Sequence, residues 1–317
     1  MNDLQKIPLV AVVGPTASGK TSLGIELAKK YNGEIISADS MQIYKYMDIA
    51  TAKPTKKEMQ GIPHHLIGFC PPDTPFSVAD YVAVAKEKIL DIHSREKLPI
   101  IVGGTGLYIS SLLNNIEFSQ SSSDENLREE LLSVAKAQGA DKLLEMLSEF
   151  DSESAKRLSE QKNVKRIVRA IEIYKTTGVT MTESIKNSRL SQPPYNDVRI
   201  GLKSENRQLL YDRVNKRVDI MLESGLLDET KRIMALNLGK TAKMAIGYKE
   251  LIPYLEGSMT LDDAIEKLKM ETRRYAKRQL TWFRRDEKIN WIDIDKLSNG
   301  DIIKEACNIV ECSRILD

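Results

Sequence analysis

Residues 9–21 read LVAVVGPTASGKT, a short apolar run followed directly by a glycine-rich loop. The loop matches the phosphate-binding pattern GxxxxGK[ST] at every fixed position. A strand, such a loop and a helix in succession turn backbone N–H groups toward an anion, and the positive end of the helix dipole adds to the attraction. The stretch therefore predicts an α/β fold with a parallel sheet that binds a di- or triphosphate.

The residues of the loop have separate expected roles. Gly14 and Gly19 suit backbone angles or a close approach that a side chain would obstruct. Lys20 brings a full charge to the outer phosphate, and Thr21 offers a hydroxyl to a magnesium ion, so we expect Mg²⁺ as the cofactor. The alternative is a glycine-rich turn that binds nothing. The expected phosphate-binding residues are Gly14, Pro15, Thr16, Ala17, Ser18, Gly19, Lys20 and Thr21.

Composition excludes several classes of protein. The chain has 317 residues, of which 41% are hydrophobic and 29% charged, as in a soluble globular protein. It has no apolar run long enough to cross a bilayer and no signal-peptide pattern, so we expect a cytoplasmic protein. Three scattered cysteines are too few for a disulfide framework or a zinc site. The net charge of +2 favours no partner, but residues 267–288 carry nine Lys or Arg against three acidic residues. Such a block is either a solvated helix face or the footprint of a polyanion.

The order of apolar segments predicts the architecture. Residues 34–38 and 98–102 are typical of buried strands, and residues 78–92 of an amphipathic helix. Polar breaks at 119–124 and 191–194 enclose a stretch, 125–186, with helical spacing and no strand. A strand follows at 198–202, and residues 207–285 are mostly helical in pattern. The sequence therefore predicts a P-loop parallel-sheet core (1–118 plus 195–317) with a mostly helical C-terminal part, and an inserted helical domain (119–194).

The carboxyl ends of the predicted strands bear on the chemistry. Ligands of such sheets bind at this edge, and the phosphate loop, Asp39 and Thr105 all lie there. P-loop hydrolases usually place an acid at the end of an apolar strand to hold magnesium. Here strand 98–102 leads into Gly103-Gly104-Thr105-Gly106 instead, which weakens the NTPase interpretation. Asp39 is the well-placed acid of this half of the chain.

Six motifs occur in a fixed order along the chain. They are GPTASGKT at 14–21, DSMQIY at 39–44, TAKP at 51–54, PHHL at 63–66, GGTGLY at 103–108 and IGYKE at 246–250. This series resembles that of the tRNA dimethylallyltransferases, also called tRNA isopentenyltransferases. One departure is Ala50, where glycine is expected. The chain shows no cysteine/histidine finger at its C-terminus, so it resembles the bacterial form.

The resemblance implies a reaction. A dimethylallyl group passes from its diphosphate to N6 of an adenine (A37) next to the anticodon of tRNA, and diphosphate is released. The developing charge of the leaving group needs the neutralisation that a phosphate loop with Lys20 and magnesium provides. Asp39 is the candidate general base for the adenine amine, with a magnesium ligand or a helix N-cap as its alternative roles.

Two further residues gain a catalytic role from the resemblance. Thr105 would bridge the leaving oxygen and the incoming amine, although a threonine after glycines by default stabilises a turn. Arg217, more than Arg213, would reach the diphosphate; the alternative is a surface helix paired with Asp212 and Asp219.

An adenine stacked in an anticodon loop must be splayed out to reach such a site, so phosphate contacts are expected around it. Two basic stretches are available, and the aromatic residues Tyr275, Trp282 and Phe283 of the second are assigned to the core by their helical spacing. His64 and His65 are assigned a structural role. The residues expected to contact tRNA are Asp39, Ser40, Met41, Gln42, Thr105, Lys162, Lys165, Arg166, Arg169, Arg274 and Arg278.

Other functions stay open at this point. A prenyltransferase of the cytokinin-synthase type, acting on AMP, ADP or ATP, would share the loop and the base but need no basic surface. A small-molecule or nucleotide kinase would use the same core for phosphoryl transfer, and an RNA-binding module would use the loop only to sense a nucleotide. The expected partners are tRNA, through its anticodon stem-loop, and dimethylallyl diphosphate, with ATP as a further occupant of the loop and the chain acting as a monomer.

Overall fold

The structure is a computed structural model that describes residues 6–116, 124–188 and 192–316. The chain divides into two compact units, one made of residues 1–113 and 194–317 and the other of residues 114–193. The larger unit contains the phosphate loop.

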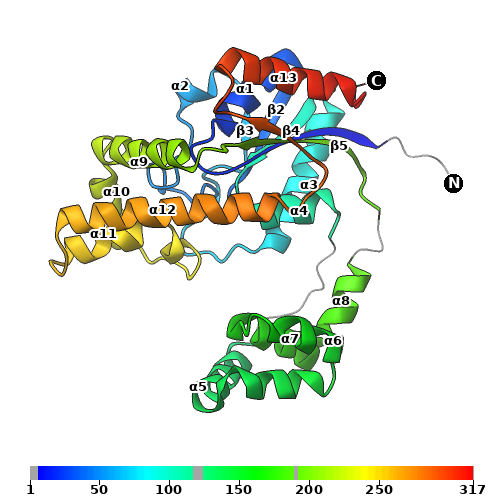
Figure 1. Ribbon diagram of the computed structural model, residues 1–317, viewed down its shortest axis with the longest axis vertical. Helices are drawn as coiled ribbons and strands as arrows, with labels where there is room; N and C mark the ends of the chain where they lie inside the picture. Colours follow the sequence, from blue (N-terminus) through cyan, green and yellow to red (C-terminus); the bar gives the residue numbers. More distant parts are fainter. Residues whose placement is uncertain (1–5, 117–123, 189–191, 317) are drawn as a thin grey trace. The chain divides into compact units, whose positions relative to one another are not determined.

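The larger unit is built on a sheet of six parallel strands in the order β3-β2-β4-β1-β5-β6 (Figure 1). Its strands are β1 (Ile7–Val13), β2 (Gly33–Ala38), β3 (His64–His65), β4 (Leu98–Gly103), β5 (Tyr195–Lys203) and β6 (Ile289–Asp293). In register, Val13 lies opposite Gly103 and Gly201, and Ala38 also lies opposite Gly103. The loops that follow β1, β2 and β4 therefore leave the sheet side by side.

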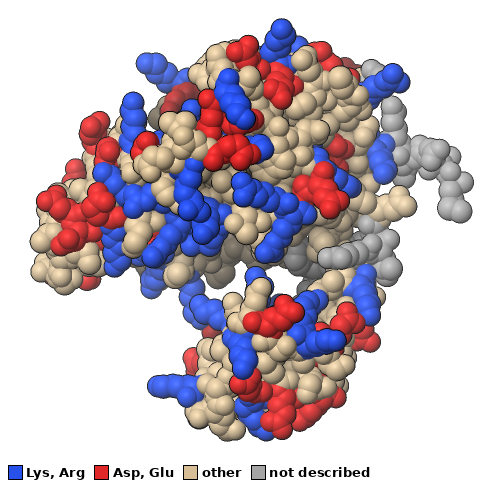
Figure 2. Space-filling view, in the orientation of Figure 1, with Lys and Arg blue, Asp and Glu red and all other residues tan. Residues whose placement is uncertain are grey.

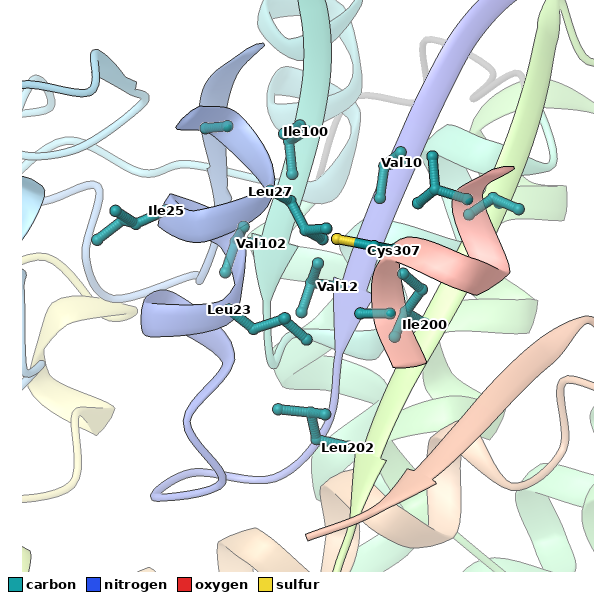
Figure 3. Packing of buried hydrophobic residues seen from close by; sticks show 14 of the residues in the cluster. Val10, Val12, Leu23, Ile25, Leu27, Ile100, Val102, Ile200, Leu202 and Cys307 are labelled. Carbon is teal, nitrogen blue, oxygen red and sulfur yellow. The ribbon is translucent and has the colours of Figure 1, made fainter. Parts of the chain in front are cut away.

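Helices cover both faces of this sheet, and the residues of the central strands β1, β2 and β4 are accordingly almost all buried. Alternate residues of β1 point to opposite faces. Val10 and Val12 pack under α1 (Lys20–Lys30) and α13 (Asn299–Cys312), where Leu27 and Cys307 meet (Figure 3). Leu9, Ala11 and Val13 belong to the opposite core, under α3 (Val78–Ser94) and α4 (Gly106–Leu113).

A group of helices extends the larger unit beyond the carboxyl edge of the sheet. It contains α9 (Arg207–Glu223), α10 (Leu226–Met234), a 3₁₀ turn (Ala242–Met244), α11 (Tyr248–Leu255) and α12 (Leu261–Phe283). The segment after β2 packs onto them, with Ile43, Tyr44 and Met47 fully buried in a core shared with these helices. A short helix, α2 (Lys56–Met59), follows that segment. These helices and loops form the walls of the site described below.

The smaller unit is entirely helical over its described residues. Its helices are α5 (Glu125–Ser148), α6 (Ser152–Ser159), α7 (Val164–Thr177) and α8 (Met181–Asn187), and α5 is interrupted at Gly139, whose φ is +82°. They share a core of their own around Leu143, Ile167 and Ile171. Glu172 is fully buried and accepts hydrogen bonds from the backbone N–H of Asp124 and from the guanidinium groups of Arg128 and Arg169. This carboxylate thus ties the start of α5 to α7.

The predicted fold class, an α/β P-loop core with helical additions, is confirmed. The helix expected at 78–92 extends to Ser94, and the strand expected at 198–202 spans Tyr195–Lys203. The strand β6 and the helix α13 were missed, because the prediction ends its regular structure near residue 285. Residues 119–123 and 191 of the two expected polar breaks lie outside the described residues.

Cys70 and Cys307 are buried and Cys312 is exposed, and all three are free thiols. Among the described helices, none is both long and apolar enough to cross a membrane.

Candidate active site

The phosphate loop lies between β1 and α1 with a backbone that its glycines permit. Gly14 has a φ of +144°, and a Cβ there would lie 2.6 Å from the carbonyl oxygen of Leu202. Gly19 has a φ of +92° and precedes α1 without a side-chain cap on the first turn of that helix. Lys20 and Ser18 both donate hydrogen bonds to the carbonyl of Pro15, at 2.5 and 2.9 Å. These two hydrogen bonds hold the loop in a compact conformation, and the positive end of the α1 dipole beside it attracts anions.

Two cations approach each other at this loop. Burial and the neighbouring charge of Arg217 lower the pKa of Lys20 to about 7, against a smaller opposing effect of Asp39. Burial also lowers the pKa of Arg217, and the charges of Asp39 and Glu58 oppose that shift. Desolvated cations held together in this way are stabilised by an anion bound between them. Arg213, one turn earlier in α9, is exposed, so of the two arginines only Arg217 faces the site.

Asp39 and Thr105 meet at the ends of the adjacent strands β2 and β4. The Oδ1 atom of Asp39 accepts hydrogen bonds from the backbone N–H groups of Met41 and Gln42, at 2.9 and 3.2 Å. The Thr105 Oγ1 atom accepts a 3.0 Å hydrogen bond from the Ser40 N–H. Asp39 therefore closes a tight turn with one oxygen, and within the described chain its Oδ2 has no hydrogen-bond partner. The sequence left a general base, a magnesium ligand and a helix N-cap as roles for Asp39; the structure adds a turn-closing contact through Oδ1.

A cavity of about 270 Å³ opens beside these residues. Its polar lining residues include Asp39, Ser40, Thr16, Arg217, Tyr275 and Arg278, and its apolar ones include Met41, Val218, Met221, Leu226, Ile246 and Leu268. Thr105 does not line the cavity itself but interacts with two residues that do, Ser40 and Tyr275, and the exposed Thr21 lies outside the cavity. The cavity thus has both charged and apolar side chains in its lining, and Thr16 of the phosphate loop reaches it.

One wall of the cavity is the loop after β2, and a buried carboxylate holds it. Glu229 in α10 is 2% exposed and accepts hydrogen bonds from the backbone N–H groups of Asp48, Ile49 and Ala50, at 2.8 to 3.0 Å. The Tyr248 hydroxyl donates a fourth hydrogen bond, at 2.7 Å. Burial and the Glu229 charge raise the pKa of Tyr248, so this hydroxyl stays a donor.

Ala50 departs from the family pattern, and the structure accommodates it. A Cβ on Gly247 would lie 2.8 Å from the Cβ of Ala50, so the absence of a side chain at 247 leaves room for the one at 50. Glu250 accepts a hydrogen bond from the Gly247 N–H at 2.8 Å and fixes the start of α11. The IGYKE motif therefore shapes the wall opposite Ala50.

Two aromatic residues of α12 do not lie in the core, so the assignment of Tyr275 and Trp282 to it was wrong. Tyr275 lines the cavity, and burial together with the Asp39 charge raises the pKa of its hydroxyl. Trp282 is 38% exposed, packs over Gly106 and donates a hydrogen bond to Ser110 at 3.0 Å. The seven-residue spacing 268, 275, 282 placed both on the face of buried Leu268, but the residues that α12 buries in its second half are Ala276, Gln279 and Phe283. Phe283 is buried in the core, as predicted.

The basic residues expected to contact tRNA differ in their exposure and in their ion pairs. On α12, Arg274 pairs with Glu271 at 2.6 Å on the surface, and Arg278 is exposed over the ring of Tyr275. Figure 2 shows lysine and arginine side chains gathered over α12; the exposed basic residues of α12 and of the turn at 284–285 are Lys267, Arg274, Lys277, Arg278, Arg284 and Arg285. In the helical unit, Lys165 and Arg166 are exposed, Lys162 pairs with Asp141 at 2.7 Å, and Arg169 pairs with buried Glu172.

The two histidines contribute to packing. His65 contacts Glu34 at 2.7 Å, and that buried carboxylate is also paired with Arg95 and Lys97, which lower its pKa far below the usual range. His64 contacts the carbonyl of Ile62 at 2.8 Å, and burial lowers its pKa. Among the described residues, no group of three or more His, Cys, Asp or Glu is placed to hold a metal.

Two buried polar residues of the site were missed, Glu229 and Gln279. Gln279 in α12 is 5% exposed and touches both the phosphate loop and the loop after β4. Each occupies a position where a helix pattern calls for an apolar residue: Glu229 lies between Leu226 and Ile233, and Gln279 between Ala276 and Phe283. A polar residue on an apolar stripe was the available signal.

The fold and the site together define a P-loop transferase that acts on a diphosphate-bearing substrate. The IPP transferase family profile matches residues 42–286. The chain is 48% identical over 309 residues to the tRNA dimethylallyltransferase of Thermoanaerobacter sp. (strain X514), covering 96% of this chain and 97% of the relative. It belongs to the tRNA dimethylallyltransferase family.

Solved structures agree with this assignment. The crystal structure of tRNA isopentenylpyrophosphate transferase from Bacillus halodurans is 43% identical and has a TM-score of 0.72, with 98% of this chain and 99% of that one covered. The structure of a eukaryotic dimethylallyltransferase acting on tRNA is 31% identical with a TM-score of 0.81, covering 96% and 78%.

Proposed function

We propose that the cavity beside the phosphate loop is where this chain transfers a dimethylallyl group from dimethylallyl diphosphate to N6 of A37 in tRNA. The chain is a tRNA dimethylallyltransferase by family. The observation that carries the placement is the polarity of the cavity, which joins Asp39, Arg217 and the phosphate loop to an apolar lining. A diphosphate attached to a short hydrocarbon needs both charged and apolar residues in its binding site.

The phosphate loop and its cations receive the departing diphosphate. As the bond between the dimethylallyl carbon and the diphosphate oxygen breaks, negative charge develops on that oxygen. Lys20 and Arg217 lie together at the loop; burial disfavours the protonated forms of both, and the charge of Arg217 adds to this effect at Lys20. These two cations therefore stabilise the negative charge that develops on the leaving oxygen in the transition state. This stabilisation lowers the activation barrier for dimethylallyl transfer.

Asp39 accepts the proton of the adenine amine. The N6 lone pair is delocalised into the ring, so the amine attacks carbon well only as its proton is taken. With Oδ1 committed to the turn, Oδ2 is the oxygen available to N6. The Thr105 hydroxyl, bonded to the Ser40 N–H, holds this turn against the loop after β4.

The phosphate loop fits a magnesium ion that is coordinated mostly by substrate phosphates and water. Mg²⁺ commonly takes one or two protein oxygens and completes its octahedron with substrate phosphates and water. Thr21 offers one exposed hydroxyl in the first turn of α1, and the described chain has no acidic cluster beside it. The bound ion would supply neutralisation of diphosphate charge.

The exposed basic residues Arg274 and Arg278, together with Lys165 and Arg166, are proposed to contact the tRNA backbone.

We also expect ATP to compete for the phosphate loop, because the loop contacts phosphates rather than the prenyl group. We propose a monomer as the active form.

The test uses dimethylallyl diphosphate and Mg²⁺ with either unmodified tRNA or AMP, followed by mass analysis of the adenosine product. Prenylated adenosine in tRNA and none from AMP is the expected result. Prenylation of AMP at a comparable rate would favour the adenine-nucleotide alternative. Replacing Arg217 with Ala should raise KM for dimethylallyl diphosphate and lower kcat, whereas Arg213→Ala, the exposed neighbour, should change neither.

A further inference from the structure

Gln279 joins the two loops that carry the opposite ends of the proposed reaction. Its side-chain oxygen accepts a hydrogen bond from the Thr16 N–H, in the phosphate loop, at 2.8 Å. Its side-chain nitrogen donates a hydrogen bond to the Gly104 carbonyl, in the loop after β4, at 3.1 Å. The contact with Gly104 is buried and that with Thr16 partly buried, and Gln279 is only 5% exposed. The amide therefore spans the gap between the two loops.

The residue after Gly104 makes this connection matter for chemistry. Thr105 is bonded to Ser40, next to Asp39, so the position of this loop affects the position of the base. The phosphate loop, in turn, positions the leaving group. Transfer requires the two reacting centres to lie within about 3–3.5 Å, and a misplacement of about 1 Å costs about 100-fold in rate.

Packing around Gln279 leaves no slack. A Cβ at Gly104 would lie 2.1 Å from the Gln279 Nε2 atom and 3.2 Å from its Cδ atom. One turn earlier on the same helix, the Tyr275 hydroxyl interacts with both Thr105 and Gln279. The glycine at 104 thus permits the close approach of the amide.

We propose that Gln279 is a positioning residue that sets the separation between the diphosphate-binding loop and the loop of Thr105, without touching substrate itself. This rests on the proposed function, in which those loops hold the leaving group and support the base. Among the described residues, no other side chain hydrogen-bonds to both loops. A glutamine suits the task because one amide offers an acceptor and a donor in a fixed geometry.

The experiment compares steady-state kinetics, pyrophosphate affinity and thermal stability of five variants and one control variant with those of the wild type. Gln279→Met removes both hydrogen bonds at similar volume, and Gln279→Asn keeps the amide but shortens its reach by one methylene. Gly104→Ala inserts the methyl group that would displace Gln279, and Gln279→Ala is made alone and with Gly104→Ala. Thr281→Ala is the control, because Thr281 is an exposed residue of α12 whose hydroxyl bonds only to its own helix.

We expect Gln279→Met, Gln279→Asn and Gly104→Ala each to lower kcat about 10- to 100-fold, with KM and pyrophosphate Kd changed by less than about 3-fold. The double variant should be no slower than Gln279→Ala alone, since the inserted methyl then has nothing to displace. Thr281→Ala should match the wild type.

Unchanged kcat with only a lower melting temperature would overturn the proposal and leave Gln279 a structural tether. Multiplied losses in the double variant would overturn it too, because the two sites would then act independently. If one variant fails to fold, Gln279→Asn, which keeps a polar amide, still gives the answer. Asp39→Asn in the same assay separates the two claims: full turnover there refutes the proposed base while leaving the Gln279 comparison readable.

Discussion

Glu229 should be the residue on which the wall of the active-site cavity depends most. Its buried carboxylate accepts hydrogen bonds from three successive backbone N–H groups, those of Asp48, Ile49 and Ala50, and from the Tyr248 hydroxyl. Replacing Glu229 with Ala removes the common acceptor of all four donors. The loop of residues 48–50 then loses its attachment to α10.

The expected loss follows from the number of donors left unsatisfied. Each buried donor without a partner costs about 1–3 kcal/mol, so four could cost as much as about 12 kcal/mol. Asp48 is exposed, so water reaches one end of the loop and satisfies part of this demand. We therefore expect Glu229→Ala to lower the free energy of unfolding by about 3–5 kcal/mol. Glu229→Gln keeps one acceptor oxygen and should cost about 2 kcal/mol.

Urea unfolding followed by tryptophan fluorescence measures the free energy of unfolding of the compact unit that contains Glu229. Both tryptophans, Trp282 and Trp291, belong to the same unit as Glu229. Asp228→Asn is the matched control, because this neighbouring carboxylate is 72% exposed. It should change stability by less than about 0.5 kcal/mol. If Glu229→Ala unfolds with the same free energy as Asp228→Asn, the reasoning about the buried carboxylate is refuted.

Two other predictions concern charge. Because the pKa of Lys20 is about 7 in the free protein and a bound anion raises it, pyrophosphate binding takes up a proton above pH 7. Its Kd should therefore rise by up to about tenfold per pH unit between pH 7 and 9, and calorimetry of Lys20→Arg, which stays charged, should give a shallower slope; equal slopes would contradict the prediction. Charge reversal of Arg274 and Arg278 together should weaken tRNA binding and reduce its logarithmic salt dependence by about one to two units. Unaltered affinity and slope in filter binding would remove α12 from the tRNA interface.

The local sequence was sufficient for the parts of the site that lie at strand ends. Strand, loop and helix around Gly14–Thr21 follow one another along the chain, and parallel topology brings Asp39 and Thr105 to the same edge. The resemblance to a family then separated Arg217 from Arg213, which spacing alone did not.

The rest depends on contacts between residues far apart in the chain. Glu229 reaches the N–H groups of residues 48–50 from about 180 positions away, and Gln279 reaches Thr16 from 263 positions away. No periodicity along the chain signals such pairs. The strand β6 was missed for a related reason: Ile289–Asp293 contains only two buried residues, and its pairing with β5 decides its structure.

The central claim is that the phosphate loop holds the leaving diphosphate while Asp39 takes the proton of the adenine amine. Single-turnover transfer by Asp39→Asn, measured alongside its pyrophosphate affinity, tests both halves together. The account predicts a rate of dimethylallyl transfer to tRNA reduced by about 10²- to 10⁴-fold with pyrophosphate Kd changed by less than about 3-fold. Transfer at the wild-type rate, or a loss of transfer explained wholly by lost pyrophosphate binding, would contradict it.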